Sequence, residues 1–272
     1  MPELPEVETT RRGIEPFLVG RTVRSVSVRE RRLRWPIPES IQEQLPGQVI
    51  DRVTRRAKYL LIGAEQGTAI LHLGMSGSLR ILPAGEPPTK HDHVDLVLDD
   101  GACLRFRDPR RFGSLHWTLD DPTKHRLLAH LGPEPLGDSF TGELLYRRSR
   151  KRKVAVKQFL MNAETVVGVG NIYASESLHA AGIHPARAAG RISKAKYKLL
   201  VTCVQATLQR AIDAGGTTLR DFANSEGKPG YFAQQLRVYG RDTEPCVVCE
   251  TPVERMVQGA RATFFCPQCQ QR

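Results

Sequence analysis

The stretch CVVCETPVERMVQGARATFFCPQC (residues 246–269) contains two Cys-x2-Cys pairs that are separated by sixteen residues. In a zinc ribbon each such pair forms a turn, and a β-hairpin joins the two turns. The letters between the pairs fit a hairpin with Gly259 near its turn, and that hairpin presents Arg261. Four thiolates fill the tetrahedral coordination of zinc, so the ion has a structural role. We predict one zinc ion bound by Cys246, Cys249, Cys266 and Cys269.

The composition indicates an intracellular protein that binds a polyanion. Forty Lys and Arg against 29 Asp and Glu give a net charge of +11 and a pI of about 9.7. This balance favours nucleic acid as the partner, with an acidic membrane surface as the second choice. No apolar run is long enough to span a bilayer, and the first residues lack the layout of a secretion signal. In a reducing compartment zinc is favoured over two disulfides, and Cys103 and Cys203 are expected to be buried thiols.

Most of the N-terminal half is predicted to be β-structure. Residues 7–20 (VETTRRGIEPFLVG) have a helical pattern, and short apolar or alternating stretches follow between turn residues. Many short strands with little helix are typical of a β-sandwich or a barrel. The predicted strands are residues 22–28, 48–55, 59–64, 68–74, 78–83, 94–98 and 102–107.

The pattern changes to helices after HLGPEPLGDS (residues 130–139), which is rich in Pro and Gly and resembles a joint between domains. In the longest predicted helix, apolar residues recur every four positions from Leu200 to Ile212, and Gly215 closes it. The predicted helices are residues 143–151, 154–162, 171–182 and 198–216, and NSEGKPGYF (residues 224–232) is a predicted loop.

Two segments of the helical part are candidates for phosphate binding. RRSRKRK (residues 147–153) has six positive charges in seven residues, although such a run is usually only a solvated face. In VVGVGNIYASESL (residues 166–178), Gly168 and Gly170 precede Asn171 at a predicted helix start, where backbone N–H groups can hold a phosphate. The alternative for this second segment is a plain joint between two helices.

Two glycine-containing stretches of the β-rich half suggest contact with a distorted duplex. They are HLGMSGSLR (residues 72–80) and DPRRFG (residues 108–113). Met75 and Phe112 are more often core residues. However, Arg110 and Phe112 beside Met75 would suit a wedge that enters a duplex where a base has left the stack.

Two histidines in KHDHVDL (residues 90–96) are predicted to point to one face of a strand. His91 and His93 could therefore suggest a metal site. Because no third ligand is evident, we favour polar contacts for them.

The first eight residues, MPELPEVE, have two explanations. Pro5 and Glu6 are ordinary start signals for a helix. After removal of Met1, however, Pro2 carries a secondary amine, and free α-amino groups titrate near ~7.7–8.0. Such an amine can attack C1′ of a sugar and form an iminium that stays cationic, because it has no N–H to lose. Glu3 is then the nearest group that can move protons.

Lys58 stands in RRAKYLL (residues 55–61), where the apolar letters predict a strand. A lysine in such a strand either extends its ammonium group to solvent or binds an anion.

Taken together, these segments resemble bacterial formamidopyrimidine-DNA glycosylases of the helix-two-turns-helix superfamily. The resemblance covers essentially the whole chain. The sister family, endonuclease VIII, typically begins PEGPE, whereas Leu4 here favours the formamidopyrimidine branch. The resemblance rests on PELPEVE, RRAKYLL, HLGMSGSLR, KHDHVD, DPRRFG, HLGPEPL, VGVGNIYASE, GIHP, GGTTL, GKPGYF, VYGR and the cysteine ribbon.

The resemblance implies four catalytic residues. Pro2 would form a Schiff base with DNA, and Glu3 would donate a proton at the sugar. Lys58 would hold a phosphate and act as the proton donor in β-elimination. Arg261 would clamp a phosphate and assist δ-elimination.

The resemblance also implies a set of DNA contacts. Phosphate contacts are expected at His72, Asn171 and Tyr239, and further DNA contacts at His91 and Arg110. Met75, Arg110 and Phe112 match the wedge. The family usually has a lysine at the basic position before VAVK, where this chain has Arg152 between Lys151 and Lys153, so the contacting side chain among these three stays open.

The resemblance implies an α+β protein with two domains. The expected parts are an N-terminal helix and β-sandwich (residues 1–134), a helix-two-turns-helix DNA-binding domain (135–236) and a zinc finger (237–272). The expected activity is excision of oxidised purines from double-stranded DNA, followed by cleavage at the abasic site, by a monomer in the bacterial cytoplasm. The alternatives are an oxidised-pyrimidine glycosylase of the endonuclease VIII branch and a non-catalytic DNA-binding protein on the same scaffold.

Overall fold

The computed structural model describes residues 2–216 and 235–271. In these ranges the chain forms two compact units, residues 2–129 with 214–216, and residues 130–213 with 235–271. The predicted loop NSEGKPGYF lies outside the described residues, as does most of the GGTTL motif. No helix in the described ranges is both long and apolar enough to cross a membrane.

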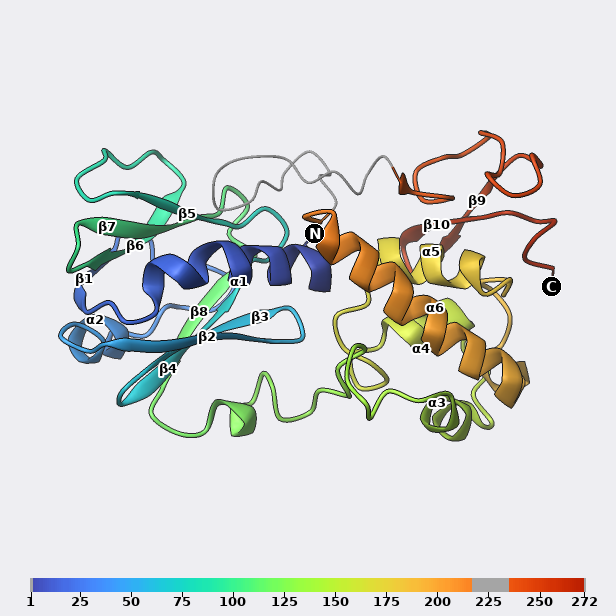
Figure 1. The fold of residues 1–272 in the computed structure, drawn as a ribbon, viewed down its shortest axis with the longest axis horizontal. Coiled ribbons are helices and arrows are strands. Elements are labelled where there is room, and N and C mark those ends of the chain that lie inside the picture. Colours follow the sequence, from blue (N-terminus) through green and yellow to red (C-terminus); the bar gives the residue numbers. More distant parts are fainter. Residues whose placement is uncertain (1, 217–234, 272) are drawn as a thin grey trace. The chain divides into compact units, whose positions relative to one another are not determined.

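The first unit is built from two antiparallel four-stranded sheets (Figure 1). Their strand orders are β1-β6-β7-β5 and β2-β3-β4-β8. Buried side chains of both sheets, such as Leu96 and Leu71, meet in one apolar core, which confirms the predicted sandwich. The elements are α1 (Leu4–Leu18), β1 (Val23–Val28), α2 (Ser40–Gln44), β2 (Ile50–Arg56), β3 (Tyr59–Ala64), β4 (Gly67–His72), β5 (Ser78–Pro83), β6 (Asp92–Leu98), β7 (Ala102–Arg107), β8 (Ser114–Thr118) and the 3-10 turn η1 (Pro122–Lys124).

Helix α1 is fixed by an apolar face that packs on strands of both sheets. Val7, Ile14 and Leu18 recur at helical spacing and are buried in the core of the unit. Pro5 occupies the first turn, where a missing N–H costs nothing. Rotation of the helix would expose this apolar face to water, so the orientation of α1 is fixed. The position of the residues that directly precede α1 is therefore fixed as well.

The second unit is helical and ends in a two-stranded hairpin (Figure 1). In α6 the predicted stripe from Leu200 to Ile212 is buried, and Gly215 follows the helix with a positive φ of 75°. The predicted hairpin is also present, because Arg261 pairs with Gln258 across a turn that contains Gly259. The elements are α3 (Gly142–Ser149), α4 (Val156–Met161), α5 (Asn171–Ala180), the 3-10 turn η2 (Ala189–Arg191), α6 (Lys194–Asp213), β9 (Glu254–Gln258) and β10 (Arg261–Phe265).

Two local predictions need correction. Lys58 does not lie inside a strand, because Arg56 pairs with Tyr59 and leaves Ala57 and Lys58 as a two-residue hairpin turn. The positive φ of Ala57 (56°) is typical of such a turn. Cys103 is buried as predicted, whereas Cys203 is only half-buried, because it flanks the apolar stripe of α6.

Two short elements were not predicted. Helix α2 has five residues, which is too short for a periodic pattern. Strand β8 (SLHWT) has polar residues at three of its five positions, yet it pairs with β4 and four of its residues are buried.

Candidate DNA-binding and catalytic sites and the zinc centre

The N-terminal pair Pro2 and Glu3 is buried immediately before α1. The backbone N–H of Glu3 donates to Glu6 Oε2 at 2.8 Å, and the side chains of both glutamates are about 2% exposed. The positive end of the helix dipole therefore lies beside the Pro2 nitrogen, with two carboxyl groups nearby. After removal of Met1 this pair would offer an amine and a carboxyl group, which are the groups that covalent attack and proton transfer require.

Lys58 and His72 form a separate pair at the end of the same sandwich. Burial lowers the pKa of His72 to about 4, and the positive charges of Lys58 and Arg34 add to this effect. The imidazole is therefore neutral at pH 7. Its Nδ1 accepts from the backbone N–H of Gly74 at 2.9 Å, so the proton is on Nε2. A neutral N–H donor beside a lysine is suited to a phosphate oxygen.

The predicted wedge residues lie on two neighbouring loops. Met75 is in the turn between β4 and β5, and Arg110 and Phe112 are in the loop between β7 and β8. All three line one pocket of about 790 Å³, together with His72. Phe112 is 45% exposed, and the Arg110 guanidinium lies 5.5 Å from its ring centroid. Phe112 is thus not a core residue, and the structure brings the three side chains together as the wedge requires.

His91 and His93 do not share a strand face, contrary to the prediction from their alternation. Strand β6 begins at Asp92, so His91 lies in the turn before it and is half-buried. His93 is buried, and its Nε2 lies 2.7 Å from the backbone oxygen of Asp108. His93 therefore makes a polar contact inside the fold, while His91 remains accessible to a ligand.

In the second unit, Asn171 and Arg261 line one small pocket of about 170 Å³. Lys157 also lines it and is 1% exposed. Its ammonium donates to Asn171 Oδ1 at 2.7 Å and to Thr263 Oγ1 at 2.8 Å. These bonds tie the first residue of α5 to β10. Arg261 is exposed at the start of β10, so the pocket is lined by one exposed and one buried positive charge.

Tyr239 joins the same group through its hydroxyl. Asn171 Nδ2 donates to Tyr239 Oη at 3.3 Å and to the backbone oxygen of Ala262 at 3.0 Å. The segment around Tyr239 is held by Glu176, which is buried in α5. This carboxylate accepts from three successive backbone N–H groups, those of Arg237, Val238 and Tyr239, at 2.9, 3.0 and 2.8 Å.

Lys157 and Glu176 were missed by reasoning from the sequence. A signal existed for both, since each is an ionisable residue among the apolar letters of a predicted helix, VAVKQFLM and NIYASESL. Charged residues at such positions are rarely fully buried unless they are paired.

Arg152 lies in the loop that precedes α4. It is exposed and lines a pocket of about 490 Å³ together with Arg148 and Gln158. Lys151 and Lys153 are exposed on either side of it, and neither lines this pocket. Among the three basic residues, Arg152 is therefore the one placed on a concave surface.

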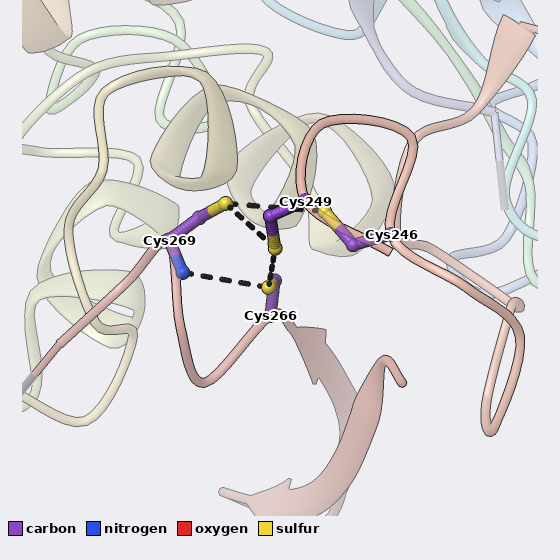
Figure 2. A group of neighbouring side chains, drawn as sticks. All are labelled: Cys246, Cys249, Cys266 and Cys269. Atoms are coloured by element: carbon purple, nitrogen blue, oxygen red, sulfur yellow. Dashed lines mark hydrogen bonds between the residues drawn. The ribbon is translucent and has the colours of Figure 1, made fainter. Parts of the chain in front are cut away.

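The four cysteines of the predicted ribbon converge (Figure 2), and their sulfur atoms all lie within 4.8 Å of one another. Tetrahedral coordination with zinc–sulfur bonds of about 2.3 Å requires sulfur–sulfur separations near 3.8 Å. The separations are 3.9 Å for Cys246–Cys269, 3.5 Å for Cys249–Cys266 and 3.4 Å for Cys249–Cys269. The donor set and its geometry therefore fit one zinc ion with no open position.

Three family models match the chain in order. They are the formamidopyrimidine-DNA glycosylase N-terminal domain at residues 1–115, the formamidopyrimidine-DNA glycosylase H2TH domain at residues 131–223, and a zinc finger found in FPG and IleRS at residues 244–272. The chain belongs to the formamidopyrimidine-DNA glycosylase family. The family resemblance inferred from the sequence is thereby confirmed, as are the α+β fold and the structural zinc.

Close relatives extend over the full length of the chain. The formamidopyrimidine-DNA glycosylases of Photobacterium profundum and Escherichia coli are 59% identical to it over 270 residues, which is 99% of this chain and 100% of theirs. The crystal structure of the FPG protein of Thermus thermophilus has a TM-score of 0.89 at 38% identity and covers 99% of this chain and 98% of its own. That of Lactococcus lactis FPG with DNA containing an abasic site has a TM-score of 0.92 at 32% identity and covers 99% and 100%.

Proposed function

We propose that this protein is a bifunctional DNA glycosylase and abasic-site lyase of base excision repair, with oxidised purines such as 8-oxoguanine and formamidopyrimidines as its substrates. The observation that carries the proposal is the buried Pro2–Glu3 pair at the start of α1, in a chain 59% identical to formamidopyrimidine-DNA glycosylases over their whole length. A protein that only binds DNA has no need for a buried amine beside a carboxyl group, and this argues against the non-catalytic alternative.

The chemistry begins at Pro2. Its nitrogen attacks C1′ of the damaged nucleotide while Glu3 gives a proton to the sugar, the bond to the base breaks, and the base leaves with the proton that the nitrogen loses. Glu3 supplies the proton that opens the sugar ring, so that C1′ becomes part of an iminium with the Pro2 nitrogen. The iminium withdraws electrons from C2′, the C2′ proton passes to the Glu3 carboxylate that ring opening has left, and the 3′ phosphate leaves in β-elimination. A second elimination releases the 5′ phosphate, and water frees the sugar remnant from Pro2.

Two clusters of side chains hold the strand during these steps. Lys58, with His72 beside it, holds a phosphate in the first unit and donates a proton in β-elimination. Asn171, Tyr239 and Arg261 hold phosphate in the second unit, and Arg261 assists δ-elimination. His91, Arg152 and the neighbouring Lys153 add charge and hydrogen bonds along the DNA. The zinc ion of the ribbon keeps the hairpin that carries Arg261 folded.

The wedge explains how a base becomes accessible. Chemistry on C1′ requires the damaged nucleotide to leave the stack, at a cost of a few kcal/mol. Met75, Arg110 and Phe112 would fill the space that it leaves. His72 lines the same pocket as the wedge residues. The side chains that fill the gap and the side chain that binds the DNA backbone therefore lie on one surface.

One observation favours a wider substrate range. A Lactococcus lactis FPG structure with a TM-score of 0.91 at 32% identity, which covers 100% of both chains, contains DNA with an oxidised pyrimidine. Oxidised pyrimidines are therefore the second candidate substrates. They would be minor, because the curated relatives at 56–59% identity carry the formamidopyrimidine name.

The site of action follows from the relatives and the substrate. The relatives are bacterial and the substrate is chromosomal DNA, so we place the protein in the bacterial cytoplasm. We also propose that the protein acts as a monomer.

The deciding experiment compares two duplexes that carry either 8-oxoguanine or thymine glycol. We expect faster single-turnover excision of 8-oxoguanine, and borohydride should trap Pro2 covalently on the DNA. A strong preference for thymine glycol would move the protein to the endonuclease VIII type of activity. Tight lesion binding with neither excision nor trapping would leave the non-catalytic alternative.

A further inference from the structure

Asp108 joins the two loops that carry the wedge. It is fully buried, at 0% exposure, although it carries a carboxyl group. Its Oδ1 accepts from Ser76 Oγ at 2.7 Å, in the turn that holds Met75. Its Oδ2 accepts from the backbone N–H of Gly113 at 2.7 Å, directly after Phe112. A buried carboxyl group is costly unless donors compensate it, and here the donors come from both loops.

The two loops also contact each other directly. The backbone N–H of Arg110 donates to Ser76 Oγ at 3.1 Å, so that hydroxyl bridges Asp108 and the Arg110 backbone. At Gly74 the backbones are so close that an added Cβ would lie 2.4 Å from the nitrogen of Gly113. The loops are therefore locked together by hydrogen bonds as well as by shape.

The backbone of Asp108 is connected to a third segment. Its N–H donates to the backbone oxygen of His91 at 3.0 Å, and its oxygen lies 2.7 Å from His93 Nε2. Asp108 thus contacts the segments that carry Met75, Arg110, Phe112 and His91, while its own side chain is closed off from solvent.

We propose that Asp108 is a positioning residue for lesion recognition, whose carboxylate makes Met75, Arg110 and Phe112 one rigid wedge before DNA arrives. This inference rests on the proposed function, because it assigns how that wedge selects a gapped duplex. Two loops that move independently lose conformational entropy when they enter the gap, and pre-joined loops have already lost it on folding. Displacing such a group by about 1 Å can cost on the order of 10²-fold in rate.

The test uses D108N and S76A in the full chain. An amide at position 108 can accept only one of the two hydrogen bonds, and S76A removes the bridging hydroxyl. The matched control is Q48M. Gln48 is also buried, and it joins helix α2 to the β3–β4 turn by donating to the Gln44 backbone oxygen and accepting from the N–H of Gln66. It lies toward the Gly67 end of β4, away from the His72 end that precedes the Met75 turn.

The measurement is the affinity for a duplex with a reduced abasic analogue divided by the affinity for the intact duplex. This ratio reports entry into the gap and needs no chemistry. We expect it to fall about tenfold in D108N and several-fold in S76A, and to stay unchanged in Q48M. In an M75A background, D108N should add little, because variants that act through the same wedge are not additive.

Three results would overturn the inference: an unchanged ratio in both variants, an equal loss in Q48M, or an undiminished effect of D108N in the M75A background. If D108N does not fold, S76A and its M75A combination decide. A failure of the proposed function looks different. The unaltered protein would then neither excise 8-oxoguanine nor be trapped by borohydride, while the affinity ratio of the variants still tests Asp108.

Discussion

The residues at the start of α1 and those around Arg261 are held in place by different means. Pro2 and Glu3 enter a helix whose buried face packs into the apolar core of a two-sheet sandwich. Arg261 lies on a two-stranded hairpin, and its nearest apolar cluster consists of Val238, Cys246, Val253, Phe264 and Cys266. A cluster of this size cannot offset the conformational entropy of the segment. The first group therefore depends on burial, and the second on Lys157, Glu176 and a metal ion.

This difference matches the chemistry that we propose for each group. An amine nucleophile needs exclusion of water and one fixed orientation, which a large core provides. A phosphate clamp needs positive charge at an exposed position, where few apolar side chains are available to hold it. The two groups should therefore respond differently to substitution, to loss of zinc and to pH.

Keeping Met1 should abolish both base excision and borohydride trapping. The proline nitrogen would then be a tertiary amide whose lone pair is delocalised, so it cannot attack C1′. Binding to a lesion duplex should persist, because the second group is untouched. Mass spectrometry of the trapped peptide identifies the residue. Trapping at Lys58 instead of Pro2 would show that MPELPEVE is only a helix start.

Substituting Glu3 with glutamine should separate two activities. Breaking the bond to the base needs proton transfer at the sugar, and loss of a positioned acid costs about 10²–10⁴-fold. A pre-formed abasic site offers an aldehyde that Pro2 can attack without that requirement. Single-turnover rates on the two substrates provide the comparison, and an equal loss on both would assign Glu3 to the whole Schiff-base pathway.

Removing zinc should affect the second group alone. Replacing Cys249 with serine should eliminate the one zinc per chain and unfold the hairpin, because a structural zinc supplies folding free energy. Lesion binding should fall at least tenfold. Both tryptophans, Trp35 and Trp117, lie in the first unit, so the midpoint of their fluorescence change on denaturation should stay the same.

The control for zinc removal is C203S. Cys203 is a half-buried cysteine of α6 outside the ribbon, so this variant should retain the metal. Elemental analysis that finds no zinc in active protein would refute the prediction. A shift of the tryptophan midpoint in the Cys249 variant would refute the independence of the two groups.

The same contrast explains what the sequence could and could not predict. The zinc ligands and α1 follow from patterns that are local in the chain, a fixed cysteine spacing and an apolar period. Lys157, Glu176 and Asp108 are connected to partners 106, 62 and 32 residues away, at Thr263, Val238 and Ser76. At residues 237–239 Glu176 binds only backbone N–H groups. Because nearly every residue type has such a group, the sequence does not reveal this contact. Lys58 was placed wrongly because a two-residue turn interrupts an otherwise apolar run.

Neutralising Lys58 or Arg261 should each change the dependence of DNA affinity on salt. Each phosphate contact contributes about −0.9 to the slope of log K against log[salt], so K58Q and R261Q should each flatten it by about one unit. The products should differ. K58Q should slow β-elimination. R261Q should allow β-elimination but block δ-elimination, so that the sugar remnant stays on the 3′ end.

The control for the salt slope is K194Q, because Lys194 is exposed and paired with Glu143 at the start of α6. It should leave the slope within a few tenths of its original value. An unchanged slope in R261Q would mean that Arg261 does not contact phosphate.

The smallest effect concerns His72, which belongs to the first unit, and it is measured through pH. Burial holds the pKa of His72 near 4, whereas an unfolded histidine titrates near 6.5. Between these values the unfolded chain binds a proton that the folded chain does not, so acidification favours unfolding. The free energy of unfolding should therefore decrease as the pH falls from about 6.5 toward 4. This histidine contributes at most about 3 kcal/mol to the decrease, at 1.36 kcal/mol per pKa unit.

In H72Q that proton is absent, so the decrease of unfolding free energy across this pH range should be smaller by up to the same amount. Denaturation followed by the fluorescence of Trp35 and Trp117 measures the first unit, to which His72 belongs. Both proteins are compared at pH 8 as well, where the imidazole is neutral in the folded and the unfolded chain and any difference reflects packing alone. Parallel pH profiles of the unfolding free energy would mean that the folded chain protonates His72 as readily as the unfolded chain does. The Gly74 hydrogen bond to Nδ1 would then be lost, and with it the reason to assign Nε2 as the neutral donor to phosphate.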